Sequence, residues 1–343
     1  MDTAGPLLAR GLRAPDFVLP RTDQTPTRFY AIAGGRPAVI CLFDAGESGQ
    51  VEAVTALATA LGQVDGLDVS LHRVARPGAS PDLQHELHNG ASIGDPDVLS
   101  DVDGKVHAAY RAGPGVTGYV LDPNLRVLDG WTDASPGDAA EAVRAAIAGL
   151  PRQEPSEITA QAPVLLIPDA LDAGMCAELM DVWEQQGSVE TGVESSAGGR
   201  RADTIAVGYK RRRDHTVTDQ ALSQRTASEV GRRIMPEIAK AFAFRASRFE
   251  GFKIGCYDAT TGGFFRAHRD NLSPSTAHRR FALTLNLNHG YSGGHLRFPE
   301  YGPQRYRPAA GAALIFSCSL LHEVLDVTDG RRFVLLSFLS GSD

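Results

Sequence analysis

Residues 257–270 read Tyr-Asp-Ala-Thr-Thr-Gly-Gly-Phe-Phe-Arg-Ala-His-Arg-Asp. In a strand, side chains two positions apart point to the same face, so His268 and Asp270 can hold one metal ion while Arg269 faces away. Two imidazoles and one carboxylate form the ligand set of facial iron(II) sites, which leave positions open for substrate and oxygen. The second histidine must come from a distant strand, and His322, which follows a buried apolar run, is the candidate.

Short apolar segments punctuated by glycine surround this stretch and predict strands. The candidate strands are 252–257, 264–270, 281–288, 295–298, 312–318, 323–327 and 333–339. Two helices are expected before them, one capped by Asp172 and stopped by Gly187, the other from about Asp219 to Phe244. Short strands after helices favour a β-sandwich or jelly roll supported by helices.

The first 150 residues alternate strand and helix signals and predict an α/β sandwich. The expected elements are a buried strand at 36–43, a helix at 51–61, a strand at 69–74, a hairpin at 119–128 and a helix at 138–150. Residues 151–162 are rich in proline and polar side chains and predict a linker. The 343-residue chain is therefore expected to form two domains, 1–150 and 163–343.

Composition indicates an ordinary globular protein, with 43% hydrophobic residues and a formal net charge of −7. No apolar run is long enough to span a bilayer, and the first residues lack a secretory pattern, which predicts a cytoplasmic protein without membrane contact. An acidic N-terminal half argues against nucleic-acid binding. The cysteines show no paired spacing and are expected to be buried thiols: Cys41, Cys176, Cys256 and Cys318.

The N-terminal segments Gly11–Pro20 and Gly118–Val127, with the buried strand, turn and helix between them, resemble a thioredoxin-fold domain of the peroxiredoxin type. Members of that family carry a peroxidatic cysteine at the start of the helix after the first buried strand. This chain has Glu-Ser-Gly-Gln at 47–50 instead, and Cys41 lies inside the strand. The resemblance therefore implies a redox-inactive domain with a structural or interaction role.

An ordered motif set in the C-terminal half resembles the prolyl 4-hydroxylase-like branch of the 2-oxoglutarate- and iron(II)-dependent dioxygenases. The motifs are Tyr257…His268-x-Asp270, Leu285–Asn288, Gly293–Pro299, Pro308–Phe316 and His322…Gly330-x-Arg332, within about 162–339. The resemblance implies a double-stranded β-helix (jelly roll) with supporting helices. It also implies Fe(II), 2-oxoglutarate and O2, and hydroxylation of an amino acid, peptidyl or small-molecule substrate with release of succinate and CO2.

The resemblance also assigns roles to individual residues. His268, Asp270 and His322 would ligate iron, and Arg332 would pair with the distal carboxylate of 2-oxoglutarate. Tyr257 would hydrogen-bond the cosubstrate, and Asn286 stands where a polar residue often assists the arginine.

Two interpretations are open for several further polar residues. His295 replaces a glutamate common in relatives, and is either a satisfied strand histidine or part of the site. Arg266, Arg280 and Arg297 either meet an acidic substrate or form ordinary ion pairs. The run Lys210-Arg-Arg-Arg213 is typical of a solvated surface loop, with a partner or an anionic substrate as the alternative. Residues 191–215 are a candidate lid over the site.

Two other function classes remain open from the sequence. The chain is alternatively a thiol-dependent peroxiredoxin-like protein, or a non-catalytic interaction protein that keeps a structural metal. The missing cysteine at 47–50 argues against the first. The triad with Arg332 argues against the second, because structural metal sites fill every coordination position. In each case the N-terminal domain is expected to recruit a protein partner, pair two subunits or stabilise the fold.

Overall fold

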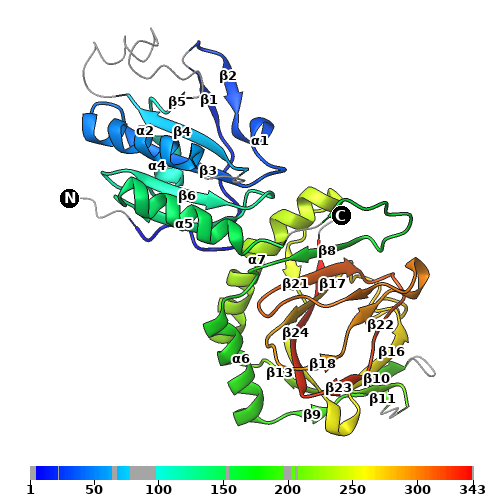
Figure 1. Cartoon of the computed structure of the whole chain (residues 1–343). Coiled ribbons are helices and arrows are strands. Elements are labelled where there is room, and N and C mark those ends of the chain that lie inside the picture. The colour runs from blue at the N-terminus through cyan, green and yellow to red at the C-terminus, as the bar shows by residue number, and fades with distance from the viewer. Residues whose placement is uncertain are drawn as a thin grey trace. The chain divides into compact units, whose positions relative to one another are not determined.

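The computed structural model describes residues 5–21, 23–63, 68–77, 98–151, 154–195, 202–204 and 208–341. The chain is a mixed α/β protein of two compact units, Met1–Glu154 and Pro155–Asp343 (Figure 1). The division falls inside the segment 151–162. Across the described residues, no helix combines the length and apolar character that crossing a membrane requires.

The N-terminal unit is built on a five-stranded sheet with the order β5-β4-β3-β6-β7. The central strand pairs in parallel with β4 and antiparallel with β6. The strands are β3 (Ala38–Asp44), β4 (Ser70–Arg76), β5 (Val98–Ser100), β6 (Thr117–Leu121) and β7 (Val127–Thr132). Because β3 is covered on both faces, it reads in sequence as a continuous apolar run.

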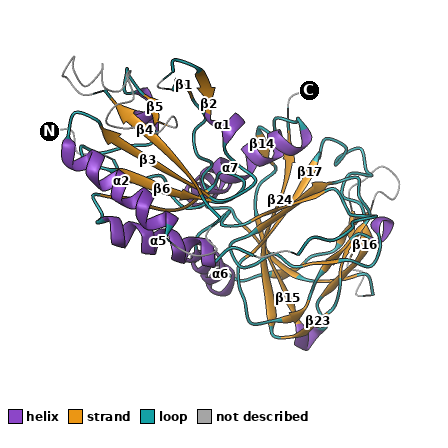
Figure 2. Ribbon diagram, turned by 45° about the horizontal axis from the view of Figure 1, so that its top comes forward, coloured by secondary structure: helices purple, strands orange, loops and turns teal. Residues whose placement is uncertain are grey.

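Helices cover the two faces of this sheet with separate apolar clusters. On one face, α2 (Ser48–Gly62) and α5 (Pro136–Ala148) pack against Val39, Cys41 and Val120. On the other face lie α1 (Phe29–Ile32), α4 (Lys105–Ala109) and the hairpin of β1 (Val18–Pro20) and β2 (Pro26–Arg28). Figure 2 shows α2 and α5 beside β3 and β6. The expected α/β sandwich is present in this unit.

The C-terminal unit contains an eight-stranded sheet in which β8-β21-β17-β24-β15-β13-β9 lie in order and β14 also pairs with β24. Its strands are β8 (Val164–Ile167), β9 (Val189–Glu190), β13 (Arg213–Thr216), β14 (Arg248–Phe249), β15 (Lys253–Asp258), β17 (Phe281–Asn286), β21 (Ala313–Ser317) and β24 (Arg331–Ser340). Helices α6 (Ala173–Gln186) and α7 (Gln220–Phe242) cover one face. The expected cap at Asp172 is confirmed, since its side chain accepts a hydrogen bond from the first turn, and Asp219 caps the second helix in the same way.

The opposite face of the large sheet packs against a second, five-stranded sheet with the order β12-β16-β22-β19-β20. Its strands are β12 (Lys210–Arg211), β16 (Phe264–His268), β19 (Leu296–Arg297), β20 (Arg305–Tyr306) and β22 (His322–Val324). One apolar cluster joins the two, with Ala282 and Val334 from the large sheet and Leu296 and Val324 from the small one. Both sheets are open, and the described strands form no closed barrel.

Short elements complete the unit. They are the strand pairs β10 (Val193–Ser195) with β11 (Ala202–Thr204) and β18 (Ser292–Gly293) with β23 (Val327–Asp329), and the 3-10 turns Ala259–Thr261 and Pro299–Tyr301.

The structure corrects three expectations in this unit. Strand β16 ends at His268, so Asp270 lies in the turn after it and not two positions along a strand. The predicted strand 323–327 is divided into β22 and β23. The predicted loop at 210–213 is replaced by the ends of β12 and β13, one in each sheet. Of the candidate lid, residues 196–201 and 205–207 lie outside the described part of the chain.

Candidate active site

Three potential metal ligands converge where β16 and β22 pair. His268 and His322 are directly opposite in the antiparallel register. The Asp270 carboxylate lies between them, with Oδ1 at 3.5 Å from His268 Nε2 and Oδ2 at 3.3 Å from His322 Nε2. One ligand atom from each residue falls within 4.8 Å of the others. The turn is fixed because the Asp270 backbone N–H donates to the Cys318 carbonyl at 2.9 Å.

Hydrogen bonds set the orientation of both imidazoles. His268 Nδ1 lies 2.8 Å from the Arg266 carbonyl, and His322 Nδ1 lies 3.0 Å from the Leu320 carbonyl. A carbonyl accepts only from a protonated nitrogen, so each Nε2 keeps its lone pair and faces Asp270. This arrangement suits metal binding through two Nε2 atoms.

The electrostatics of His322 and Asp270 favour the same protonation states. Burial lowers the pKa of His322 to about 4, so its ring is neutral near pH 7. Burial alone would raise the pKa of Asp270, but His322 and His268 outweigh it and the net pKa lies below the ordinary value. Neutral imidazoles and an ionised carboxylate are the forms that bind a divalent cation.

A buried arginine stands on strand β24 of the large sheet. Arg332 is 1% exposed, and its Nε and Nη2 donate to Asn286 Oδ1 at 3.2 and 2.9 Å. Asn286 is held by its own donation to the Tyr291 hydroxyl and the Pro308 carbonyl. Arg332 Nη1 is buried and has no hydrogen-bond partner among the described residues. Since an unpaired buried cation is costly, this nitrogen is suited to an anionic ligand.

Tyr257 lies opposite Arg332 on the neighbouring strand β15, with the guanidinium 5.6 Å from its ring centre. Its hydroxyl accepts a hydrogen bond from Arg212 Nη1 at 3.1 Å. Arg212 itself donates through Nε and Nη2 to the two oxygens of Asp214, at 2.6 and 2.8 Å. Sequence reasoning placed Arg212 in a solvated loop and missed this contact. The spacing Arg212-x-Asp214, typical of a same-face pair on a strand, was the available signal.

A profile of the family described as the 2OG-Fe(II) oxygenase superfamily matches residues 252–340, which contain the triad and Arg332. These residues form a 2OG-Fe(II) oxygenase domain. Two curated PKHD-type hydroxylases, from Synechococcus strains JA-2-3B'a(2-13) and JA-3-3Ab, are each 31% identical over 104 residues. The match covers 28% of this chain and 46% of each relative, so the chain spans about half the length of the curated relatives it matches. These matches support an oxygenase or hydroxylase.

Solved structures give more remote likenesses. A prolyl-4-hydroxylase from Pseudomonas putida aligns with 18% identity and a TM-score of 0.41, over 53% of this chain and 95% of the other. An exposed lipoprotein thioredoxin from Streptococcus pneumoniae aligns with 16% identity and a TM-score of 0.33, over 38% of this chain and 99% of the other.

The oxygenase domain and the segments before it enclose a cavity of about 800 Å³. The triad, Tyr257, Lys210 and Arg212 line it. Its apolar lining comes from both sheets and includes Phe265, Leu296, Phe316, Val324, Leu336 and Phe338. A cavity with polar groups placed on an apolar wall is typical of a small-molecule or side-chain binding site.

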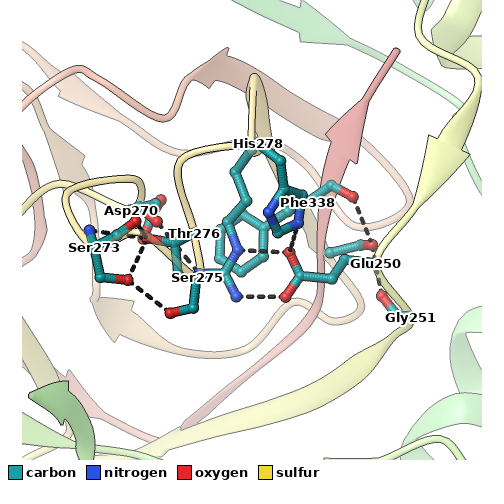
Figure 3. Close-up of polar contacts among 10 residues, drawn as sticks. Glu250, Gly251, Asp270, Ser273, Ser275, Thr276, His278 and Phe338 are labelled. Carbon is teal, nitrogen blue, oxygen red and sulfur yellow. Dashed lines mark hydrogen bonds and ion pairs between the residues drawn. The ribbon is translucent and has the colours of Figure 1, made fainter. Parts of the chain in front are cut away.

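The loop after Asp270 is held by a second arginine that sequence reasoning passed over in favour of Arg280. Arg279 donates to Glu250 Oε2 at 2.6 Å and to the Asp270 carbonyl at 3.3 Å, and its guanidinium lies 3.9 Å from the Phe338 ring centre. Figure 3 shows His278 against the same Glu250, and the hydroxyls of Ser273 and Ser275 in contact across the loop. These contacts fix the backbone that carries Asp270.

The remaining candidates from the sequence lie away from the cavity lining. Arg266 pairs with Asp326 at 3.2 Å, and Arg297 pairs with Glu323 at 2.6 Å. Arg280 is exposed, just before β17. His295 is half-buried, its pKa lowered by burial and by Arg307, and it is not part of the triad. None of these four is among the described residues that line the cavity, and the substrate contact expected of them stays a prediction.

Proposed function

We propose that this protein is an Fe(II)- and 2-oxoglutarate-dependent dioxygenase. It hydroxylates an unactivated C–H bond of an amino acid, peptidyl or small-molecule substrate and releases succinate and CO2. The observation that carries the proposal is the buried Arg332 Nη1, which has no partner among the described residues and belongs to a guanidinium 5.6 Å from the ring of Tyr257, a residue that lines the same cavity as the His268–Asp270–His322 cluster. One group suits an anionic cosubstrate and the other a divalent metal.

His268, Asp270 and His322 would hold the iron. When bound, iron and 2-oxoglutarate supply the oxidative decarboxylation and the oxidation of the substrate carbon. The protein keeps the three ligands in place through the Arg266 and Leu320 carbonyls and the Cys318 contact described above. All three side chains line the cavity, so a metal held by them would be reached from it.

Arg332 binds the distal carboxylate of 2-oxoglutarate. Asn286 fixes the guanidinium by taking Nε and Nη2, which leaves Nη1 to donate to the cosubstrate. Tyr257 orients the cosubstrate through its hydroxyl. The apolar wall, with Phe316 and Val324, excludes water and so strengthens these polar contacts.

We further infer that the two facing sheets of the C-terminal unit form a double-stranded β-helix. For the N-terminal unit we propose a thioredoxin-like domain without peroxidase chemistry that stabilises the fold, binds a protein partner or pairs two subunits. Two observations support the loss of redox chemistry. Helix α2 begins with Ser48-Gly-Gln and no cysteine, and burial raises the pKa of the Cys41 thiol to about 12.

Anaerobic titration tests the dioxygenase proposal. Fe(II) with 2-oxoglutarate should give a metal-to-ligand charge-transfer band, and succinate should form when O2 is admitted. His268→Ala should abolish both, because one of three ligands is lost. His289→Ala is the matched control, since His289 is exposed and outside the cluster. Absence of both the band and 2-oxoglutarate-dependent succinate from the wild-type protein would contradict the proposal.

A further inference from the structure

We propose that the substrate presents a carboxylate to Lys210 and Arg212 while an apolar part of it fills the remaining cavity. This inference rests on the proposed function, and it names the substrate class of the same site. Successive side chains of the basic run 210–213 point to opposite sides, as expected for an extended chain. Lys210 and Arg212 face the cavity, whereas Arg211 and Arg213 are exposed on the other side.

The two inward cations are built into the site. Lys210 is 6% exposed, and its Nζ donates to Thr191 Oγ1 at 2.6 Å. The Arg212 side chain is 10% exposed and is held bidentately by Asp214. Asp214 lies behind this pair, since it is buried and is not among the residues that line the cavity. The cavity therefore meets the positive groups, while their carboxylate partner is on the far side.

A single aromatic ring connects these cations to the metal ligands. Lys210 Nζ is 5.2 Å and the Arg212 guanidinium 5.9 Å from the Phe265 ring centre. The Phe265 ring also stacks on the His268 ring, with the ring centres 3.6 Å apart. The distance from each cation to the His268 ring centre is therefore at most the sum of its distance to the Phe265 ring centre and the 3.6 Å between the two ring centres. A group bound there lies in the same cavity as the metal ligands, with the Phe265 ring between them.

The charges on the cavity wall favour an anion. Among its described lining residues, the basic side chains are Lys210, Arg212, Lys253, Arg269 and Arg279, and the acidic ones are Glu250 and Asp270. Glu250 pairs with Arg279 and His278, Arg269 pairs with Glu300, and Asp270 belongs to the triad. The other cations of the wall are Lys253 and the pair Lys210 and Arg212, which Asp214 backs. A substrate carboxylate at Lys210 and Arg212 would gain charge-assisted hydrogen bonds.

The backing Asp214 also selects the kind of anion. Because it offsets part of the positive charge of the pair, the wall suits a monoanion better than a phosphate dianion. The lining beyond the pair is apolar, with Leu296, Leu336 and Phe338. A substrate that combines a carboxylate with a hydrocarbon or aromatic portion matches both features.

Matched acid and amide probes test this inference. The probes are 3-phenylpropionate with 3-phenylpropionamide, and N-acetyl-L-leucine with N-acetyl-L-leucinamide. Calorimetry on the 343-residue protein, saturated with 2-oxoglutarate under anaerobic conditions with and without Fe(II), measures each Kd. The acids should bind at least about tenfold more tightly than the amides, the gain expected of one charge-assisted contact.

Variants of the basic run assign the effect. Lys210→Met and Arg212→Gln should each reduce the acid preference to about twofold or less, and Lys210→Arg should retain it. Arg213→Gln removes a neighbouring cation from the outer face and should behave as wild type. Circular dichroism confirms folding, and because Lys210→Arg keeps the charge, it separates loss of charge from loss of structure.

The inference would be overturned by equal binding of acid and amide, by no binding of either acid, or by a preference that survives both substitutions. A fall in 2-oxoglutarate affinity as large as the fall in probe affinity would also overturn it, because the cations would then serve the cosubstrate. Failure of the dioxygenase proposal is distinguishable, since it removes the Fe(II)–2-oxoglutarate band but leaves the calorimetric comparison in place.

Discussion

Replacing Arg332 by methionine separates the effect of this buried charge on stability from its role in binding 2-oxoglutarate. In the free protein the substitution removes two hydrogen bonds to Asn286 Oδ1, each contributing about 1 kcal/mol, and leaves that oxygen unpaired at a further cost of about 1–3 kcal/mol. It also removes a buried cation whose Nη1 has no partner among the described residues, a relief of up to several kcal/mol. The two effects nearly cancel, so the free energy of unfolding should change by less than about 2 kcal/mol.

Cosubstrate binding should respond very differently. Loss of the charge-assisted contact to the distal carboxylate should cost roughly 3 kcal/mol, which weakens the Kd for 2-oxoglutarate on the order of 100-fold. The assays are anaerobic titration of the charge-transfer band and urea unfolding with and without 2-oxoglutarate. Wild-type protein should gain stability from 2-oxoglutarate, and Arg332→Met should gain almost none.

Arg331→Met is the matched control. Arg331 is the adjacent residue, points to the opposite face of β24 and pairs with Glu184 at 2.7 Å on the surface. It should leave the 2-oxoglutarate Kd unchanged. If Arg332→Met bound 2-oxoglutarate within about threefold of wild type, or lost more than about 4 kcal/mol of stability, the reasoning from the unpaired Nη1 would be refuted.

Three further predictions follow from single observations. The pKa of His322 is lowered from 6.5 to about 4, so between these values the unfolded chain binds the proton that the folded one rejects. Stability of the metal-free protein should therefore be fully present above pH 6.5 and fall as the pH drops toward 4; an equally steep fall in His322→Asn would contradict this. A Cβ at Gly118 would lie 2.1 Å from the Trp131 ring, so Gly118→Ala should destabilise the N-terminal unit by about 2 kcal/mol or more, measured by Trp131 fluorescence with Gly137→Ala as control. Cys41 is fully buried with a pKa of about 12, so a thiol reagent should label it only on unfolding, and rapid labelling of the native protein would argue for surviving redox chemistry.

Elements with a strong local pattern were predictable from the sequence. The apolar run of β3, the caps at Asp172 and Asp219 and the β-strands around the triad each follow from side chains within a few residues. The contact between Asn286 and Arg332 was also expected, although only through the family resemblance. The roles assigned to these side chains remain proposals.

The sequence could not show which charged side chains point inward and which point to solvent. Arg266, Arg280, Arg297 and Arg212 all lie in or beside predicted strands or loops, and all carry the same charge. Whether each points inward depends on register: Arg297 is opposite Glu323 on β22, whereas Asp214, two residues after Arg212, pairs with Gly255 on β15. A glycine at 255 leaves space above that strand, because a Cβ there would lie 3.0 Å from Arg212 Cδ. Such a vacancy is set by pairing between distant segments, and single-sequence patterns do not report it.

Arg332 and Arg212 are held by different kinds of side chain, and this difference implies an order in which 2-oxoglutarate and the substrate bind. Arg332 is held by a neutral amide, so its whole charge is available to the ligand at Nη1. Arg212 is held by a carboxylate, which offsets part of its attraction for an anion. An anion at Arg332 should therefore be bound more tightly than one at Arg212. Because the cavity wall at Tyr257 connects the two guanidinium groups, filling the Arg332 site first would fix the ring whose hydroxyl Arg212 contacts. On this reasoning 2-oxoglutarate binds before the carboxylate substrate, and its presence should tighten binding of the acid probes without affecting the amides.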